Sequence, residues 1–101
     1  MISSTIFAEG QLSNAKATLF TFTAAGVGVE INLCNTDTVD RIVKIYLKPG
    51  STSRQLFAAT LEADGGSASY TFKGLPIGAV IEGEAAAANV VDYSIWGGEV
   101  S

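Results

Sequence analysis

Hydrophobic and polar residues alternate along most of this chain with a period of two, the pattern of β-strands that bury one face. The clearest case is residues 27–33, where we expect one buried face made of Val27, Val29, Ile31 and Leu33. Residues 41–48 alternate in the same way, and a Pro-Gly-Ser turn signal follows them. Both segments therefore predict half-buried strands.

Weaker versions of the pattern predict strands over residues 17–23, 55–61, 68–72, 80–82 and 89–96. In the first of these, Phe20 and Phe22 fall on one face and Leu19 on the other. Residues 55–61 also suit a short helix because Ala, Leu and Gln favour helices, and we expect a strand there. Asp64-Gly65-Gly66 is a turn signal that predicts a tight hairpin. The alanines of residues 85–88 are too few for a stable helix, so we expect a turn there between the last two strands.

Seven or eight short strands, spaced about 8–13 residues apart with turn signals between them, predict an all-β fold. The chain length of 101 residues suits one domain. We expect a single antiparallel β-sandwich, jelly-roll or immunoglobulin-like, over residues 13–101. Residues 1–12 are either its first strand or an extended arm that pairs with a neighbour's sheet edge.

Composition narrows the possible partners. With 48% hydrophobic and 16% charged residues the chain is not disordered. Its net charge is −4 and its six Lys and Arg are scattered, so nucleic acid is a poor partner. No apolar run approaches the roughly 18 residues of a membrane span, and residues 1–7 lack the features of a signal peptide.

The chemistry available to the chain is limited because it has no histidine. This excludes a Ser-His-Asp triad, a Cys-His pair and a zinc site built on imidazole. Glu82 and Glu84 could serve as a general acid and base, although a solvated strand end is the expected role, and Asp37 and Asp40 flank a turn rather than a calcium loop. Lone Cys34 predicts a small, buried, inert side chain. We expect no enzyme, no catalytic or metal-binding residues and no cofactor.

Four apolar residues near the chain ends are candidates for binding a partner. Ile2, Ile6 and Phe7 lie among Ser and Thr in the first segment. Trp96, beside Gly97 and Gly98, is either a core-edge residue or an exposed aromatic anchor in a subunit interface or a sugar platform.

From Asn35 onward, over about two-thirds of the chain, the order of features resembles small virion structural proteins of tailed bacteriophages. The matching segments are the Asn-Thr turn at residues 35–38, the strand at 41–47, the Gly-rich turn at 61–67, the Gly-Leu-Pro-Ile-Gly corner within 74–81, and the closing strand at 88–99. Two positions differ from the family pattern: Ala79 replaces Asp, and Trp96 replaces a small residue.

The resemblance implies a virion protein without catalytic residues. The first interpretation of the resemblance is that the chain is a head decoration, or cement, protein. Such a protein would be made in the host cytoplasm and would bind the major capsid protein on the outer capsid surface in many copies, as a homotrimer. The alternative is a tail, neck or fibre component, including a host-surface binding module. For sugar binding the only candidates are Tyr93 near Asp92 and Tyr70 near Lys73.

Overall fold

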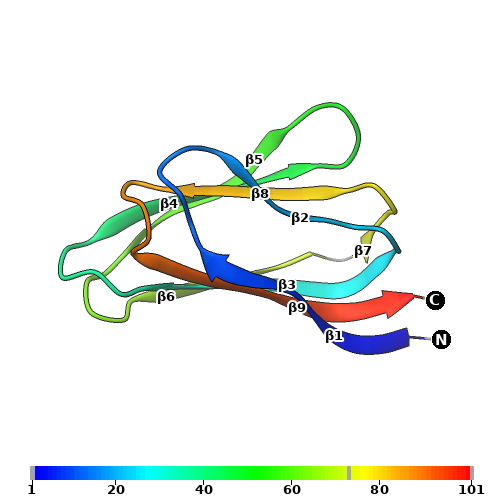
Figure 1. The fold of residues 1–101 in the computed structure, drawn as a ribbon, viewed down its shortest axis with the longest axis horizontal. Helices are drawn as coiled ribbons and strands as arrows, with labels where there is room; N and C mark the ends of the chain where they lie inside the picture. The colour runs from blue at the N-terminus through cyan, green and yellow to red at the C-terminus, as the bar shows by residue number, and fades with distance from the viewer. Residues whose placement is uncertain (1, 73, 101) are drawn as a thin grey trace.

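The computed structural model describes residues 2–72 and 74–100, with side chains from residue 5 onward (Figure 1). The described residues form nine β-strands: β1 (Ile2–Gln11), β2 (Ala17–Thr21), β3 (Gly26–Asn35), β4 (Arg41–Lys48), β5 (Arg54–Leu61), β6 (Ser67–Thr71), β7 (Gly74–Leu75), β8 (Val80–Ala85) and β9 (Val91–Val100). No helix that could cross a membrane occurs among them. The all-β prediction is confirmed.

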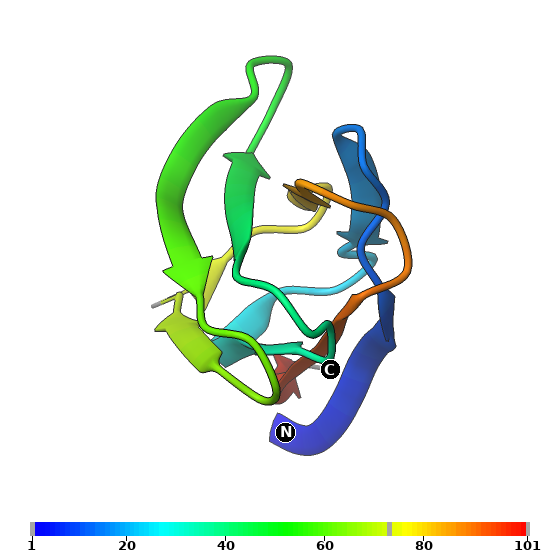
Figure 2. The same cartoon turned by 90° about the vertical axis from the view of Figure 1, so that its left-hand side faces the viewer.

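The strands form two antiparallel sheets that pack face to face (Figures 1 and 2). Sheet A has the order β1-β9-β3-β6, with the two-residue β7 also pairing with β3, and sheet B has the order β2-β8-β4-β5. The first main strand pairs with the last, β2 with β8, β3 with β6, and β4 with β5. This nested pairing, shared between two sheets, is the jelly-roll arrangement.

The core is the apolar layer between the sheets, and alternation along the central strands supplies it. Val43 and Ile45 on β4 are fully buried, as are Ile31 on β3 and Ile95 on β9. Phe20 and Phe22 are in edge-to-face contact with ring centroids 4.9 Å apart. The predictions that Val43 and Ile45 face the core and that Phe20 and Phe22 lie on one face are therefore correct.

Residues 55–61 form most of strand β5, so the strand prediction for this segment is confirmed over its helical alternative. Residues 86–90 form the connection from β8 to β9, as the short alanine run predicted. Cys34 is only half-buried, not buried, because it alternates with Leu33 and Asn35 and so lies on the outer face of sheet A.

Two β-bulges overturn predictions that assumed strict alternation. Val27 is exposed rather than buried, because the pairing of β3 with β9 shifts between Val27 and Glu30. Gly28 within this bulge has φ +59°, a conformation that favours glycine. In β2 the register shifts between Thr18 and Phe20, so Leu19 packs against the core with Phe20 instead of facing away from it.

The predicted hairpin at Asp64-Gly65-Gly66 is wrong in kind. Asp64 and Gly65 do have positive φ, at 59° and 109°. However, β5 before the turn belongs to sheet B and β6 after it belongs to sheet A. The turn is therefore a corner between the sheets, because the glycines specify a change of direction but not the sheet that receives the next strand.

Asn35 holds this corner together. Its side chain is fully buried, and its Nδ2 donates hydrogen bonds to the carbonyl oxygens of Val39, Leu61 and Glu62 at 2.9, 3.0 and 3.2 Å. Its Oδ1 accepts a hydrogen bond from the backbone N–H of Asp37 at 2.9 Å. One amide thus ties the β3–β4 loop to the end of β5.

Candidate interaction surface

The outer face of sheet A carries an exposed apolar pair on β1 and β9, the two strands whose free ends carry the chain termini (Figure 1). Ile6 on β1 and Trp96 on β9 are directly opposite in the antiparallel register. Ile6 is 50% exposed and Trp96 45% exposed. The structure therefore brings two of the four candidate partner-binding residues together at the surface.

A β-bulge in β1 follows directly after Ile6. The pairing of β1 with β9 shifts between Ile6 and Ala8, so Phe7 is the extra residue. Phe7 is half-buried and packs against the core, with its ring centroid 5.3 Å from that of Phe20 and 4.9 Å from that of Phe22. Alternation along the strand places Ile6 outward and Phe7 inward. The bulge allows both Phe7 and the next residue, Ala8, to pack against the core, so Phe7 does not contribute to the exposed surface.

Beside this pair lies a shallow hollow lined by Thr5, Ile6, Gly28, Trp96, Gly97 and Gly98. Close backbone packing accounts for one of its glycines, Gly97, and a positive φ for another, Gly28. A Cβ added to Gly97 would lie 2.9 Å from the Cα of Val29, so no other residue fits there without a shift. The absence of side chains at these positions leaves one flank of Trp96 open.

Two further exposed residues extend the apolar area, Val27, opposite Gly98, and Val100 at the end of β9. We call Ile6, Val27, Trp96 and Val100 the Trp96 patch. Ile2 is opposite Val100 in the register, but its side chain lies outside the described part of the structure. The patch occupies one end of sheet A.

The other end of the same face is polar. A second hollow there is lined by Glu9, Asn32, Leu33, Cys34, Ser67, Asp92, Tyr93 and Ser94. Gln11 Nε2 donates a 3.0 Å hydrogen bond to Asp92 Oδ1 across β1 and β9. This end of the face is therefore more polar than the Trp96 end, where Glu30, opposite Trp96 on β3, accepts a hydrogen bond from Thr71 beside the apolar residues.

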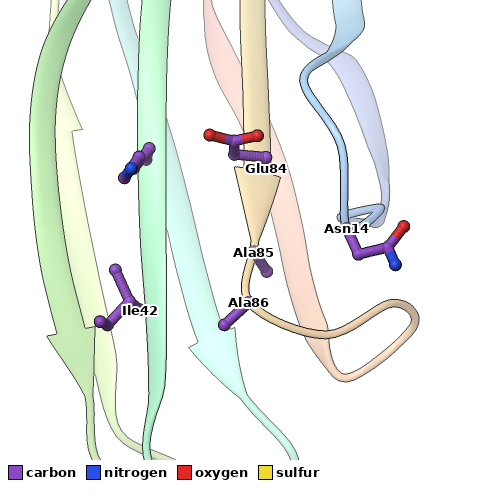
Figure 3. Close-up of a pocket in the computed structure, with 6 residues that line it drawn as sticks. Asn14, Ile42, Glu84, Ala85 and Ala86 are labelled. Atoms are coloured by element: carbon purple, nitrogen blue, oxygen red, sulfur yellow. The ribbon is translucent and has the colours of Figure 1, made fainter.

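The outer face of sheet B has a hollow of its own, lined by Asn14, Ile42, Lys44, Glu84, Ala85 and Ala86 (Figure 3). Glu84 and Glu82 do share this face, as their spacing predicted. Each carboxylate accepts a hydrogen bond from its own hydroxyl partner, Glu84 from Tyr46 at 2.7 Å and Glu82 from Ser53. The two are held separately rather than aimed at a common point.

The electrostatics of this face do not activate a nucleophile. The hydrogen bond to Glu84, together with burial and the charges of Glu84 and Glu82, raises the pKa of Tyr46 above its ordinary value of 10.0. Tyr46 therefore stays a protonated donor. Lys16 Nζ lies 4.8 Å from the centre of the Tyr46 ring and donates a 3.3 Å hydrogen bond to Ser53 Oγ. The network orders the β4–β5 loop against sheet B.

Within the described ranges, no three His, Cys, Asp or Glu side chains gather in a way that could hold a metal ion. Asp37 and Asp40 have structural roles in the turn. Asp37 forms a 2.7 Å ion pair with Arg41, and Asp40 accepts a hydrogen bond from the backbone N–H of Ala63. These contacts match the turn role expected of the two aspartates.

The tyrosines considered for sugar binding are not exposed platforms. Tyr93 packs against the core while its neighbour Asp92 faces solvent on the other side of the strand. Tyr70 is stacked on Phe57 at 5.3 Å and meets Phe72 edge-on at 5.0 Å. Lys73, which was paired with Tyr70 in that prediction, lies outside the described residues.

Comparison with known proteins supports the fold. No protein-family model matches the sequence, and no curated protein matches it either. A pentameric capsid protein isolated from metagenomic phage sequences matches 92% of the chain with 15% identity and a TM-score of 0.54, and the chain spans 62% of that protein's length. A subunit of the disulfide-linked pili that form Bacillus endospore appendages matches the whole chain with 13% identity over 88% of its own length, with a TM-score of 0.57.

A capsid protein and a pilus protein thus share this sandwich at sequence identities that establish the fold alone. Sequence reasoning identified Ile6 and Trp96 but missed Val27 and Val100. The signal for Val27 was Gly28, which allows the bulge that turns Val27 outward.

Proposed function

We propose that this protein is a non-enzymatic structural subunit of a bacteriophage particle, and specifically a decoration protein that binds the outer capsid surface in many copies. The observation that carries the proposal is the Trp96 patch, an exposed apolar area that contains a tryptophan. Exposed tryptophans with apolar neighbours are typical anchors of protein interfaces. The resemblance of residues 35–99 to phage virion proteins and the jelly-roll fold support the same interpretation.

The contact with the major capsid protein is assigned to Ile6 and Trp96, with Ile2, opposite Val100, earlier on the same strand as Ile6. Phe7 is left out because it packs in the core. The two exposed side chains come from adjacent strands of one sheet, so the fold holds them in a fixed geometry and little conformational entropy is lost on binding.

The mechanism is mass action. A protein that binds the expanded capsid but not its dissociated subunits stabilises the shell in proportion to the logarithm of its concentration relative to its dissociation constant. Linked copies that touch several capsid subunits would gain avidity. A trimer, as expected from the resemblance, would supply three such contacts, although the proposal requires only that copies repeat over the capsid surface.

The test is co-sedimentation of the purified protein with expanded capsids, unexpanded capsids and isolated tails, combined with the melting temperature of the capsid. Binding to expanded capsids with a higher melting temperature supports the proposal. Binding to tails alone, or no binding, overturns it.

A matched pair of variants shows whether the Trp96 patch makes the contact. Ile6→Ser removes an isoleucine that is 50% exposed on sheet A, and Ile42→Ser removes one that is 51% exposed on sheet B. The first should weaken capsid binding and the second should not. Equal binding by the two variants would assign the contact to another surface.

A second candidate is a fibre-forming subunit, such as a tail fibre component. It is supported by the match to the pilus subunit, which covers the whole chain. Purified protein that forms filaments visible by electron microscopy without any capsid would favour this function.

A further inference from the structure

The two sheets have four edge strands within the described residues, and β1 differs from the other three. It is ten residues long, whereas β2 and β6 have five each and β5 has eight. β1 lies at the rim of the fold, and in the described part of the chain it pairs with β9 alone (Figure 2). Alternate peptide groups along its outer edge are therefore open to another strand.

Natural edge strands are commonly protected by charged residues, proline or β-bulges. Residues 2–6 of β1 have none of these, since the bulge lies after Ile6 and the first charged residue after that. Residues 2–8 carry no charge, and the first charged residue is Glu9. A long, uncharged edge is a template for pairing with a strand from another chain.

We propose that β1 pairs antiparallel with β1 of a second copy, around a two-fold axis at Ser4. This inference does not rest on the proposed function. The sequence Ile2-Ser3-Ser4-Thr5-Ile6 is self-complementary in this register. Ile2 lies opposite the partner's Ile6, Ser3 opposite the partner's Thr5, and Ser4 opposite the partner's Ser4. β-branched apolar pairs and Ser–Thr pairs are favourable when directly opposite in antiparallel strands.

The same register continues the rows of sheet A into the second chain. Val100 is opposite Ile2, and Ile6 is opposite Trp96, within each chain. Pairing at Ser4 therefore aligns Val100, Ile2, the partner's Ile6 and the partner's Trp96 in one apolar row, and the two-fold axis generates a second. An arrangement in which the same surface meets itself is the commonest form of homodimer.

Charge does not oppose the contact, although each copy has a net charge of −4. In this register residues 2–6 of one copy pair with residues 2–6 of the other, and these five residues carry no charge. Edge pairing extends the sheet within its own plane and leaves the outer face open. The two Trp96 patches would then form one continuous surface.

Substitution at Ser4 tests the two-fold axis directly, because residue 4 would meet itself there. Ser4 is opposite Gly98, a residue without a side chain, in the register of β1 with β9. Ser4→Lys and Ser4→Glu each place like charges opposite one another and should raise the dimer dissociation constant roughly tenfold or more. Ser69→Lys puts the same charge on β6, the other edge of sheet A, and serves as the matched control.

Sedimentation velocity over a range of protein concentrations gives the readout, and circular dichroism with thermal unfolding verifies that each variant is folded. We expect the wild type and Ser69→Lys to dimerise and the two Ser4 variants to be monomers. An equimolar mixture of Ser4→Lys and Ser4→Glu should dimerise again, because opposite charges then meet at the axis. Misfolded variants could not produce this recovery.

Three results would overturn the inference: a wild type that stays monomeric at every concentration, Ser4 variants that associate as well as the wild type, or folded Ser4 variants that do not recover on mixing. The assay contains no capsid. A failure here therefore leaves the capsid-binding proposal intact, and a failure of capsid binding leaves the dimer intact.

Discussion

Ile6 and Trp96 lie opposite one another across β1 and β9, and both face solvent, although the next paired residues, Ala8 and Ile95, face the core. Alternation along the two strands accounts for the change of face between these pairs. The bulge adds Phe7 to β1, so that Phe7 and Ala8 both pack against the core while Ile6 and Trp96 stay at the surface.

Trp96 is the single tryptophan of the chain and therefore a specific probe of the patch. Protein labelled with fluorotryptophan should give one fluorine resonance that responds to a soluble paramagnetic quencher, because the side chain is half exposed. Binding to expanded capsids should protect this resonance. If quenching of the bound protein equals that of the free protein, Trp96 is not in the contact.

Asn35 should be among the polar residues most sensitive to substitution, because its side chain donates three hydrogen bonds and accepts one. Asn35→Ala leaves buried backbone groups unpaired and should reduce the free energy of unfolding by about 2–4 kcal/mol. Urea denaturation measures this loss. Asn32→Ala, on the outer face of the same strand, is the control and should change stability by about 0.5 kcal/mol or less.

Much of the fold follows from the sequence because the central strands keep strict alternation. Strand β4 has the predicted bounds, residues 41–48, since Val43 and Ile45 need the same face and the Pro-Gly pair stops the strand. The sequence of β5 suits either a helix or a strand because of its alanines. Pairing with β4 decides between the two. A tertiary contact thus overrides local propensity.

The parts that the sequence did not predict depend on non-local geometry. A bulge shifts the faces of every residue beyond it, and this is why Val27 is exposed. The sequence predicted a partner contact for Phe7 because the aromatic residues that it packs against, Phe20 and Phe22, are distant from it along the chain. The Trp96 patch itself required the pairing of β1 with β9, which joins the two ends of the chain.

Gly97→Ala should destabilise the protein because the new Cβ would lie 2.9 Å from the Cα of Val29, a backbone atom that cannot move freely. We expect a loss of about 1–3 kcal/mol, the usual range for overpacking. Gly50→Ala is the control, since a Cβ there meets nothing within 4 Å. Thermal unfolding of the two variants gives the comparison, and equal stability would show that β3 and β9 can separate at little cost.

The ion pair of Asp37 with Arg41 should make part of the stability depend on pH. The hydrogen bond from Arg41, followed by that from the backbone N–H of Thr38, lowers the pKa of Asp37 below its ordinary value of 3.8. A carboxyl group whose pKa is lower in the folded state stabilises the fold above its unfolded pKa, and this contribution is lost as the pH falls through the folded value. Asp37→Asn should therefore be less stable than the wild type at neutral pH.

The difference between the wild type and Asp37→Asn should shrink as the pH falls below about 3.8, because the wild-type carboxyl then becomes neutral as well. Urea denaturation from neutral pH down to about pH 2.5 follows this change. The same comparison in the Arg41→Gln background is the control. Arg41 is the main cause of the lowered pKa of Asp37, so its removal should remove most of the pH dependence of the stability difference. A difference that stays constant at all pH values would mean that the substitution acts through the fit and hydrogen bonding of the side chain and not through the charge of Asp37.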